Sequence, residues 1–163
     1  MKRDNRGFSL VELIVVVLIM AIVAVAVSAA IIKWVNNSRN STDIQTRNSL
    51  RDNVAVSLTN DQAFKAVRDG GYEIHITKND AGVITYSYSG DVDAAGRPNE
   101  SNPYWKYLLE TTACADFYEF EQRFTIKSEP STGQNISIDV VVYNQGFTEV
   151  DLNGIENDDL DLS

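Results

Sequence analysis

The sequence has little with which to build a cross-linked or catalytic site. Among its 163 residues, Cys114 is the only cysteine and His75 the only histidine. A single cysteine cannot form an intrachain disulfide, and its small neighbours favour a buried structural thiol. One histidine without ligands at matching spacing does not build a zinc site, so we expect His75 to lie on the face of a strand. No Gly-x-Ser-x-Gly motif accompanies them, and we expect neither enzymatic activity nor a cofactor.

Positive charge is also scarce. No Lys or Arg follows Lys127, whereas eight acidic residues do. Three of the 14 basic residues and one of the 23 acidic residues lie within residues 1–7, so the remainder has 11 basic and 22 acidic side chains and a formal charge of −11. Such a chain does not bind nucleic acid through a general cationic surface. The balance favours a soluble, self-repelling domain.

Helix-breaking residues are missing where the sequence is most apolar. Residues 13–32 contain no charge, no Gly and no Pro, and only Ser28 is not apolar. As a helix this run is about 30 Å long, which is the thickness of the hydrocarbon core of a bilayer. The run therefore predicts a transmembrane helix. Basic residues before it place the N-terminus in the cytoplasm and the remainder outside, with Lys33 and Trp34 at the far membrane interface.

The junction between the charged leader and the apolar run is abrupt. It reads Arg6-Gly7-Phe8-Ser9-Leu10-Val11-Glu12-Leu13. The apolar segment begins at Phe8, so Glu12 puts a carboxylate just inside it. A charge there costs about 3 kcal/mol or more depending on depth and so usually has a partner or a function. The pattern resembles the N-terminus of type IV prepilins and of the pseudopilins of type II secretion and DNA uptake. Their motif is a short basic leader, Gly, Phe-(Thr/Ser)-Leu-(Val/Ile)-Glu and a hydrophobic stretch.

The resemblance implies a processing event and an assembly role. A prepilin peptidase would cut between Gly7 and Phe8 on the cytoplasmic side and N-methylate Phe8. Gly7 fits because a residue without Cβ lets an extended backbone enter a tight protease cleft. The carboxylate of Glu12 would neutralise the α-ammonium of Phe8 in a neighbouring subunit, since opposite charges attract strongly where the dielectric is low.

The family likeness also implies partners and a location. The partners are prepilin peptidase, other pilin subunits, an assembly ATPase with its membrane platform, and the membrane. The subunit would be a single-pass membrane protein and, after assembly, part of a cell-surface filament. Many major pilins carry Gly and Pro within the hydrophobic stretch, and their absence from residues 20–30 favours a minor pilin or a pseudopilin.

Two alternatives start from the same residues. In the first, the run is an ordinary single-pass anchor that is never cleaved, and Glu12 simply reaches the cytoplasmic interface. In the second, the run belongs to a secretory signal peptide, because residues 24–30 offer small side chains for a cleavage site on its far side.

Together the patterns predict an α+β fold, in which a long N-terminal helix with a transmembrane half and an amphipathic half packs on a small antiparallel β-sheet. Residues 36–67 contain neither Gly nor Pro and show apolar periodicity, and Gly70-Gly71 would end the helix. The expected divisions are a leader at 1–7, a transmembrane and filament-core helix at 8–34, its amphipathic continuation at 35–69, and an exported β-rich domain at 70–163.

Alternating apolar and polar residues predict the strands of that domain, with Asn79-Asp80-Ala81-Gly82 as a hairpin turn between the first two. The expected strands are 72–77, 83–88, 117–126, 136–143 and 147–152, and a short helix is expected at 104–115. Trp105 and the tyrosines could form an adhesive surface, but packing in the core or on the sheet explains most of them equally well.

The acidic C-terminal segment contains oxygen ligands suited to Ca²⁺. The candidate ligands are Asp151, Asn153, Glu156 and Asp158. The segment lacks the spacing of an EF-hand, which requires Gly at its sixth position and Glu at its twelfth. A solvated acidic tail is the alternative, and it is the one we favour.

Overall fold

The computed structural model describes residues 9–68, 70–144 and 146–155. The chain divides into two compact units, Met1–Ser38 and Arg39–Ser163, and α1 contributes residues to both. The elements in chain order are α1 (Leu10–Ser57), α2 (Asp61–Arg68), β1 (Tyr72–Lys78), β2 (Ile84–Ser89), α3 (Pro103–Thr112), α4 (Phe117–Arg123), β3 (Ile136–Val142) and β4 (Thr148–Asn153).

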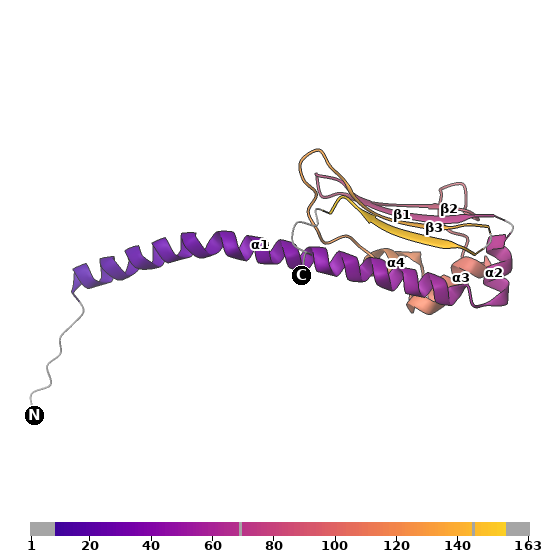
Figure 1. Ribbon diagram of the computed structural model, residues 1–163, viewed down its shortest axis with the longest axis horizontal. Helices are drawn as coiled ribbons and strands as arrows, with labels where there is room; N and C mark the ends of the chain where they lie inside the picture. The colour runs from indigo at the N-terminus through magenta and orange to yellow at the C-terminus, as the bar shows by residue number, and fades with distance from the viewer. Residues whose placement is uncertain (1–8, 69, 145, 156–163) are drawn as a thin grey trace, which may run out of the picture. The chain divides into compact units, whose positions relative to one another are not determined.

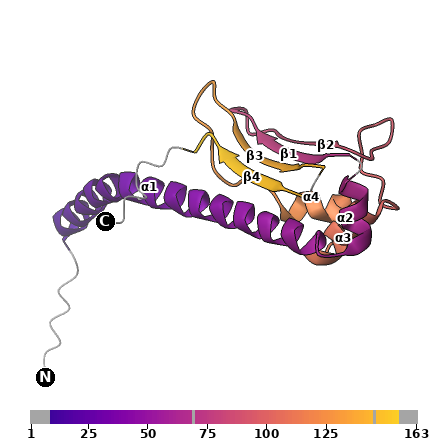
Figure 2. The same cartoon turned by 45° about the vertical axis from the view of Figure 1, so that its right-hand side comes forward.

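The second unit is built on a four-stranded antiparallel sheet. Its strand order is β2-β1-β3-β4, so β1 pairs with both β2 and β3 although β3 follows much later in the chain. The helices α3 and α4 and the second-unit part of α1 lie on one face of this sheet (Figure 1), and Figure 2 shows the four strands side by side. The expected α+β fold is confirmed.

Period-two alternation decides which face of the sheet is buried. In β1 and β3 successive residues are alternately buried and half-buried. The buried side chains meet the apolar residues of the helices, so one face is core and the other is solvated. Cys114 is buried, as the sequence predicts. Trp105 and Tyr104 are fully buried, so for these two residues packing in the core holds. The largest core residues are Trp105, Tyr104, Phe120, Leu50, Ile74, Ile76, Leu108, Ile126, Ile136 and Ile138.

One predicted strand is wrong. The sequence predicts a strand at residues 117–126, but Phe117–Arg123 form the helix α4. Asp116 caps this helix by accepting a hydrogen bond from the Glu119 backbone N–H, and the Glu119 carboxylate reaches back to the N–H of Ala115. This reciprocal capping pattern starts a helix whatever the β-propensity of the residues that follow.

The long helix is also shorter than expected. The sequence predicts helix through residue 67, but α1 ends at Ser57 and α2 begins at Asp61. The side chain of Asn60 accepts hydrogen bonds from the backbone N–H groups of Gln62 and Ala63, at 2.8 and 3.4 Å, so it caps α2 as a new helix. The other strands and α3 lie within three residues of their predicted ends.

Candidate functional site

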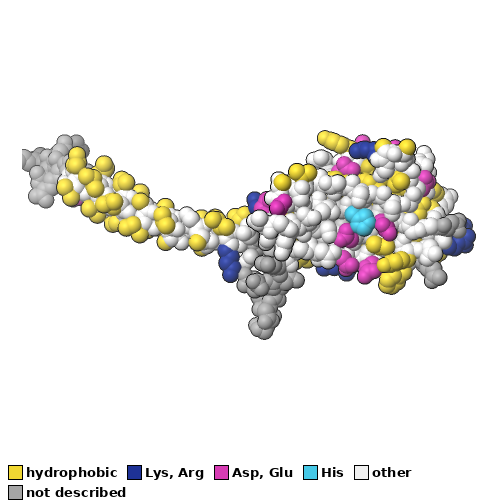
Figure 3. Space-filling view, turned by 90° about the horizontal axis from the view of Figure 1, so that it is seen from above, with side chains coloured by type: hydrophobic (Ala, Val, Ile, Leu, Met, Phe, Trp, Pro, Cys, Tyr) yellow, Lys and Arg dark blue, Asp and Glu magenta, His cyan; other side chains and the backbone are white. Residues whose placement is uncertain are grey.

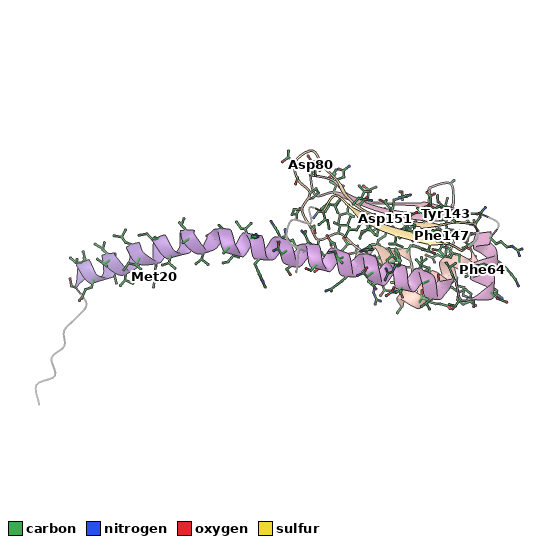
Figure 4. All side chains as sticks on the ribbon, in the orientation of Figure 1. Met20, Phe64, Asp80, Tyr143, Phe147 and Asp151 are labelled. Atoms are coloured by element: carbon green, nitrogen blue, oxygen red, sulfur yellow. The ribbon has the colours of Figure 1, made fainter. Side chains whose placement is uncertain are left out.

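The first-unit part of α1 presents apolar side chains on every side. Between Leu10 and Ile32 the large apolar side chains are 45% to 76% exposed, and hydrophobic atoms cover this part of the helix in Figure 3. Met20, labelled in Figure 4, is typical at 66%. An 18-residue window has a mean hydropathy of 3.2 with none of it buried, so α1 is long enough and apolar enough to cross a membrane.

The polar atoms in this apolar stretch are satisfied within the helix. The hydroxyl of Ser28 donates to the carbonyl oxygen of Ala24 at 2.7 Å, one turn back. A hydroxyl bonded in this way brings no free donor into hydrocarbon. Ser28 therefore does not interrupt the apolar surface.

The start of α1 is a capping box formed by Ser9 and Glu12. The Ser9 hydroxyl oxygen accepts from the backbone N–H of Val11 at 3.2 Å, and Glu12 Oε2 accepts from the backbone N–H of Ser9 at 2.8 Å. The carboxylate lies in the first turn, where the helix dipole favours negative charge. The capping box gives Glu12 a structural role within a single subunit, in addition to the role that the resemblance implies.

The other predicted residues of this region are placed as follows. Gly7 and Phe8 lie outside the described residues. Lys33 and Trp34 lie on α1 near the end of the apolar stretch, both exposed, with Trp34 at 71%. The sequence positions of Lys33 and Trp34 thus remain compatible with a membrane interface.

His75 lies on the solvated face of β1, as the sequence predicts. Its Nδ1 is 2.7 Å from Asp139 Oδ1 on β3, and its Nε2 is 3.1 Å from Glu73 Oε2. The hydrogen bond to Asp139 raises the pKa of His75; burial opposes this shift and the bond to Glu73 adds to it. This arrangement is a hydrogen-bonded cross-strand pair, and it becomes an ion pair when His75 is protonated.

The calcium candidates are not brought together. Asp151 and Asn153 lie on β4, and the amide of Asn153 donates to Asp139 at 3.1 Å. Glu156 and Asp158 lie outside the described residues. Within the part of the chain that the structure describes, no group of three or more His, Cys, Asp or Glu residues is arranged to hold a metal ion.

A polar site that the sequence did not indicate holds α1 to the segment before β3. Asp43 is fully buried on α1, and its two carboxylate oxygens accept from the backbone N–H groups of Lys127 and Ser128 at 2.7 and 2.8 Å. The ammonium of Lys78 donates to the Ser128 carbonyl at 2.8 Å, and Asn40 accepts from the Ser128 hydroxyl. From the sequence alone, an acidic residue on a helix is expected to be exposed to solvent. The partners that bury Asp43 lie 84 and 85 residues away, so no local pattern indicates them.

Comparison with known proteins bears on the first unit alone. Neither a curated protein nor a solved structure matches the chain. The family model for the prokaryotic N-terminal methylation motif matches residues 2–28, which contain the capping box and most of the apolar stretch. This motif supports a processed subunit of the pilin or pseudopilin kind. The chain carries the N-terminal methylation motif that is the signature of type IV pilins.

Proposed function

We propose that this protein is a structural subunit of a type IV pilus-like filament, a minor pilin or a pseudopilin. The observation that carries the proposal is the apolar surface of α1, which is exposed on all sides from Leu10 to Ile32. A surface of this kind is stable only against lipid or against other apolar helices. The methylation motif at residues 2–28 supports a processed subunit of the pilin or pseudopilin kind.

Processing comes first in this proposal. Prepilin peptidase cuts between Gly7 and Phe8 and methylates the new N-terminus, while the apolar helix anchors the subunit with its N-terminus in the cytoplasm and its second unit outside. Assembly follows, and the helices of many copies pack together as a head-to-tail array that does not close on itself. An assembly ATPase and its platform protein drive this assembly.

Glu12 has the capacity for both a capping and an assembly role. Its Oε2 accepts the Ser9 N–H, but a carboxylate offers about four lone-pair sites and can accept further donors. Cleavage before Phe8 creates an ammonium group four residues away in sequence. In an apolar filament core this charge requires a carboxylate partner, and Glu12 of a neighbouring copy provides one.

Mass spectrometry of the N-terminus in the native membrane fraction tests the processing step. The proposal expects the chain to begin at N-methylated Phe8. A chain that retains the leader would make the protein an ordinary single-pass anchor, and a chain that begins beyond Ala26 would make it a secreted protein with a signal peptide. Either result contradicts the proposal.

A pair of variants at Glu12 tests the assembly role, in a strain that requires this subunit for its filaments. Glu12→Gln retains a residue that completes a capping box but removes the charge, whereas Glu12→Ala removes both. If the charge pairs with Phe8, both variants insert into the membrane and neither enters filaments. Normal filaments with Glu12→Gln alone would show that capping, not charge, is what assembly needs.

A further inference from the structure

Three aromatic side chains lie exposed together at one end of the second unit. They are Phe64 on α2 and Tyr143 and Phe147 on either side of the β3–β4 turn, and we name them the aromatic patch (Figure 4). Phe64 is 40% exposed, Tyr143 43% and Phe147 68%. The rings of Tyr143 and Phe147 have centroids 5.9 Å apart. A Cβ on Gly146 would lie 2.5 Å from the Phe64 ring, so Phe64 packs against the turn that separates the other two.

The turn holds the aromatic patch in a fixed arrangement. The Gly146 N–H donates to the Tyr143 carbonyl at 2.9 Å, and the Tyr143 N–H donates to the Phe147 carbonyl at 2.8 Å. Gly146 has φ of 76°, a left-handed conformation that side chains disfavour, and any side chain there would collide with Phe64. Aromatic residues held in this way lose little conformational entropy when a partner binds them.

The solvated face of the sheet next to the aromatic patch is acidic. The Tyr143 hydroxyl donates to Glu149 Oε2 at 3.0 Å, which joins the patch to the first of the carboxylates. Asp139 and Asp151 are direct cross-strand partners, a like-charge pair that costs stability. Figure 3 shows acidic side chains around the single histidine, with hydrophobic side chains beside them. The outward positions of β1, β3 and β4 are Glu73, His75, Thr77, Ser137, Asp139, Val141, Glu149, Asp151 and Asn153, with no Lys or Arg.

Charge decides which partner this surface fits. The carboxylates on this face repel the same acidic face of a second copy. A cationic partner is attracted by them, and the faces of aromatic rings also bind Arg and Lys side chains. We propose that the aromatic patch, with Glu149 and Asp151, is a docking surface for an Arg- or Lys-bearing segment of another protein. The proposal does not depend on the filament role.

Binding of a defined peptide to the full-length chain in nanodiscs of zwitterionic lipid tests this surface. The probe is a fluorescein-labelled dodecapeptide of alternating arginine and tyrosine, and the control peptide has glutamate in place of arginine. We expect fluorescence anisotropy to show binding of the arginine peptide alone. Phe147→Ser weakens this binding about tenfold, because an anchoring aromatic residue is lost. Glu149→Gln with Asp151→Asn also weakens it and makes it less sensitive to salt.

Matched variants elsewhere on the second unit separate this surface from general stickiness. Tyr118 on α4 is 65% exposed and Asp52 on α1 has a side chain 71% exposed, so Tyr118→Ser and Asp52→Asn change similar groups outside the surface. These controls should bind the peptide as the unaltered chain does. Near-UV circular dichroism checks that each variant is folded, and Tyr143→Ser replaces Phe147→Ser if the latter does not fold.

Three results would overturn the proposal. The first is equal binding of the arginine and glutamate peptides. The second is an equal loss of affinity in Phe147→Ser and Tyr118→Ser. The third is sedimentation showing that the second unit self-associates through the patch, with Phe147→Ser restoring monomers, which would make the surface an interface between copies.

Discussion

The two parts of α1 show how one helix can serve two kinds of environment. The first-unit part buries none of its described residues, whereas the part from Arg39 to Ser57 buries Asp43, Leu50, Val54 and Ser57. These four lie seven, four and three residues apart, a spacing that puts them on one face of a helix. Helix formation is common to both parts, so what distinguishes them is which side chains have a partner inside the subunit. Under the proposed function, the first part finds its apolar partner in a membrane or in another copy.

The largest predicted contrast is between two truncations of apolar residues in this helix. Leu50 is fully buried in the core, so Leu50→Ala should lower the free energy of unfolding of the second unit by about 3 kcal/mol. Val17 is 58% exposed in the first unit, so Val17→Ala should change it by less than about 0.5 kcal/mol. Denaturant titration of the full chain in detergent, followed by near-UV circular dichroism, measures both. A comparable loss in Val17→Ala would mean that the apolar part supports the second unit after all.

A second contrast concerns two acidic residues of the second-unit part of α1. Asp43→Ala leaves the buried N–H of Ser128 and the half-buried N–H of Lys127 without an acceptor, which should cost about 2–3 kcal/mol. Asp52 has an exposed side chain that pairs with the exposed side chain of the adjacent Arg51, so Asp52→Ala should cost less than about 0.5 kcal/mol. The same titration measures both variants, and equal effects would contradict the role of Asp43 in holding α1 to the segment before β3.

The sequence predicts those parts of the fold in which a local pattern and its environment agree. The strands near residues 72–78 and 136–142 alternate cleanly, and each was predicted to within one residue of its end. The apolar run is recognisable by its length and composition, and the motif around Glu12 by its resemblance to type IV prepilins. The exposure of the apolar side chains of α1 between Leu10 and Ile32 follows from the same apolar composition.

Other parts depend on capping or on distant contacts. A strand is predicted where α4 lies, although the pair Asp116 and Glu119, read together, is a helix-start signal. The break before Asp61 had a similar signal in Asn60. The burial of Asp43 and the gathering of Phe64 with the β3–β4 turn have no local signal, because the partners are remote in the chain.

A smaller contrast compares two serines that make the same kind of hydrogen bond. The hydroxyl of Ser57 is buried and donates to the Val54 carbonyl at 2.7 Å, and that of Ser28 donates to Ala24 at the same distance but is exposed. Ser57→Ala should lower the free energy of unfolding of the second unit by about 1 kcal/mol. Ser28→Ala should leave it unchanged, as thermal unfolding in detergent would show. A lower free energy of unfolding in Ser28→Ala would contradict the distinction between the two parts of α1.

The smallest effect that we predict is a pH dependence confined to the second unit. His75 has its pKa raised above 6.5, chiefly by its hydrogen bond to Asp139. Burial tends to raise the pKa of Asp139, but hydrogen bonds from Ser137, His75 and Asn153 outweigh it, and the net shift is below 3.8. A raised pKa gives stability that is lost as pH rises through the folded value, and a lowered pKa gives stability that is lost as pH falls.

The two shifts together define the pH window in which the pair stabilises the sheet. Because the pKa of His75 is raised above 6.5 and that of Asp139 is lowered below 3.8, His75 is mostly protonated below pH 6.5 and Asp139 mostly ionised above pH 3.8, so the pair contributes most between these values. The difference in melting temperature between the unaltered chain and His75→Gln should therefore be largest near pH 5 and shrink by pH 8. Because the pair is partly exposed, salt should reduce that difference. A difference in melting temperature that stays constant from pH 5 to pH 8 would show that His75 contributes by packing rather than by charge. The contrast between the two parts of α1 would then rest on the burial of their side chains alone.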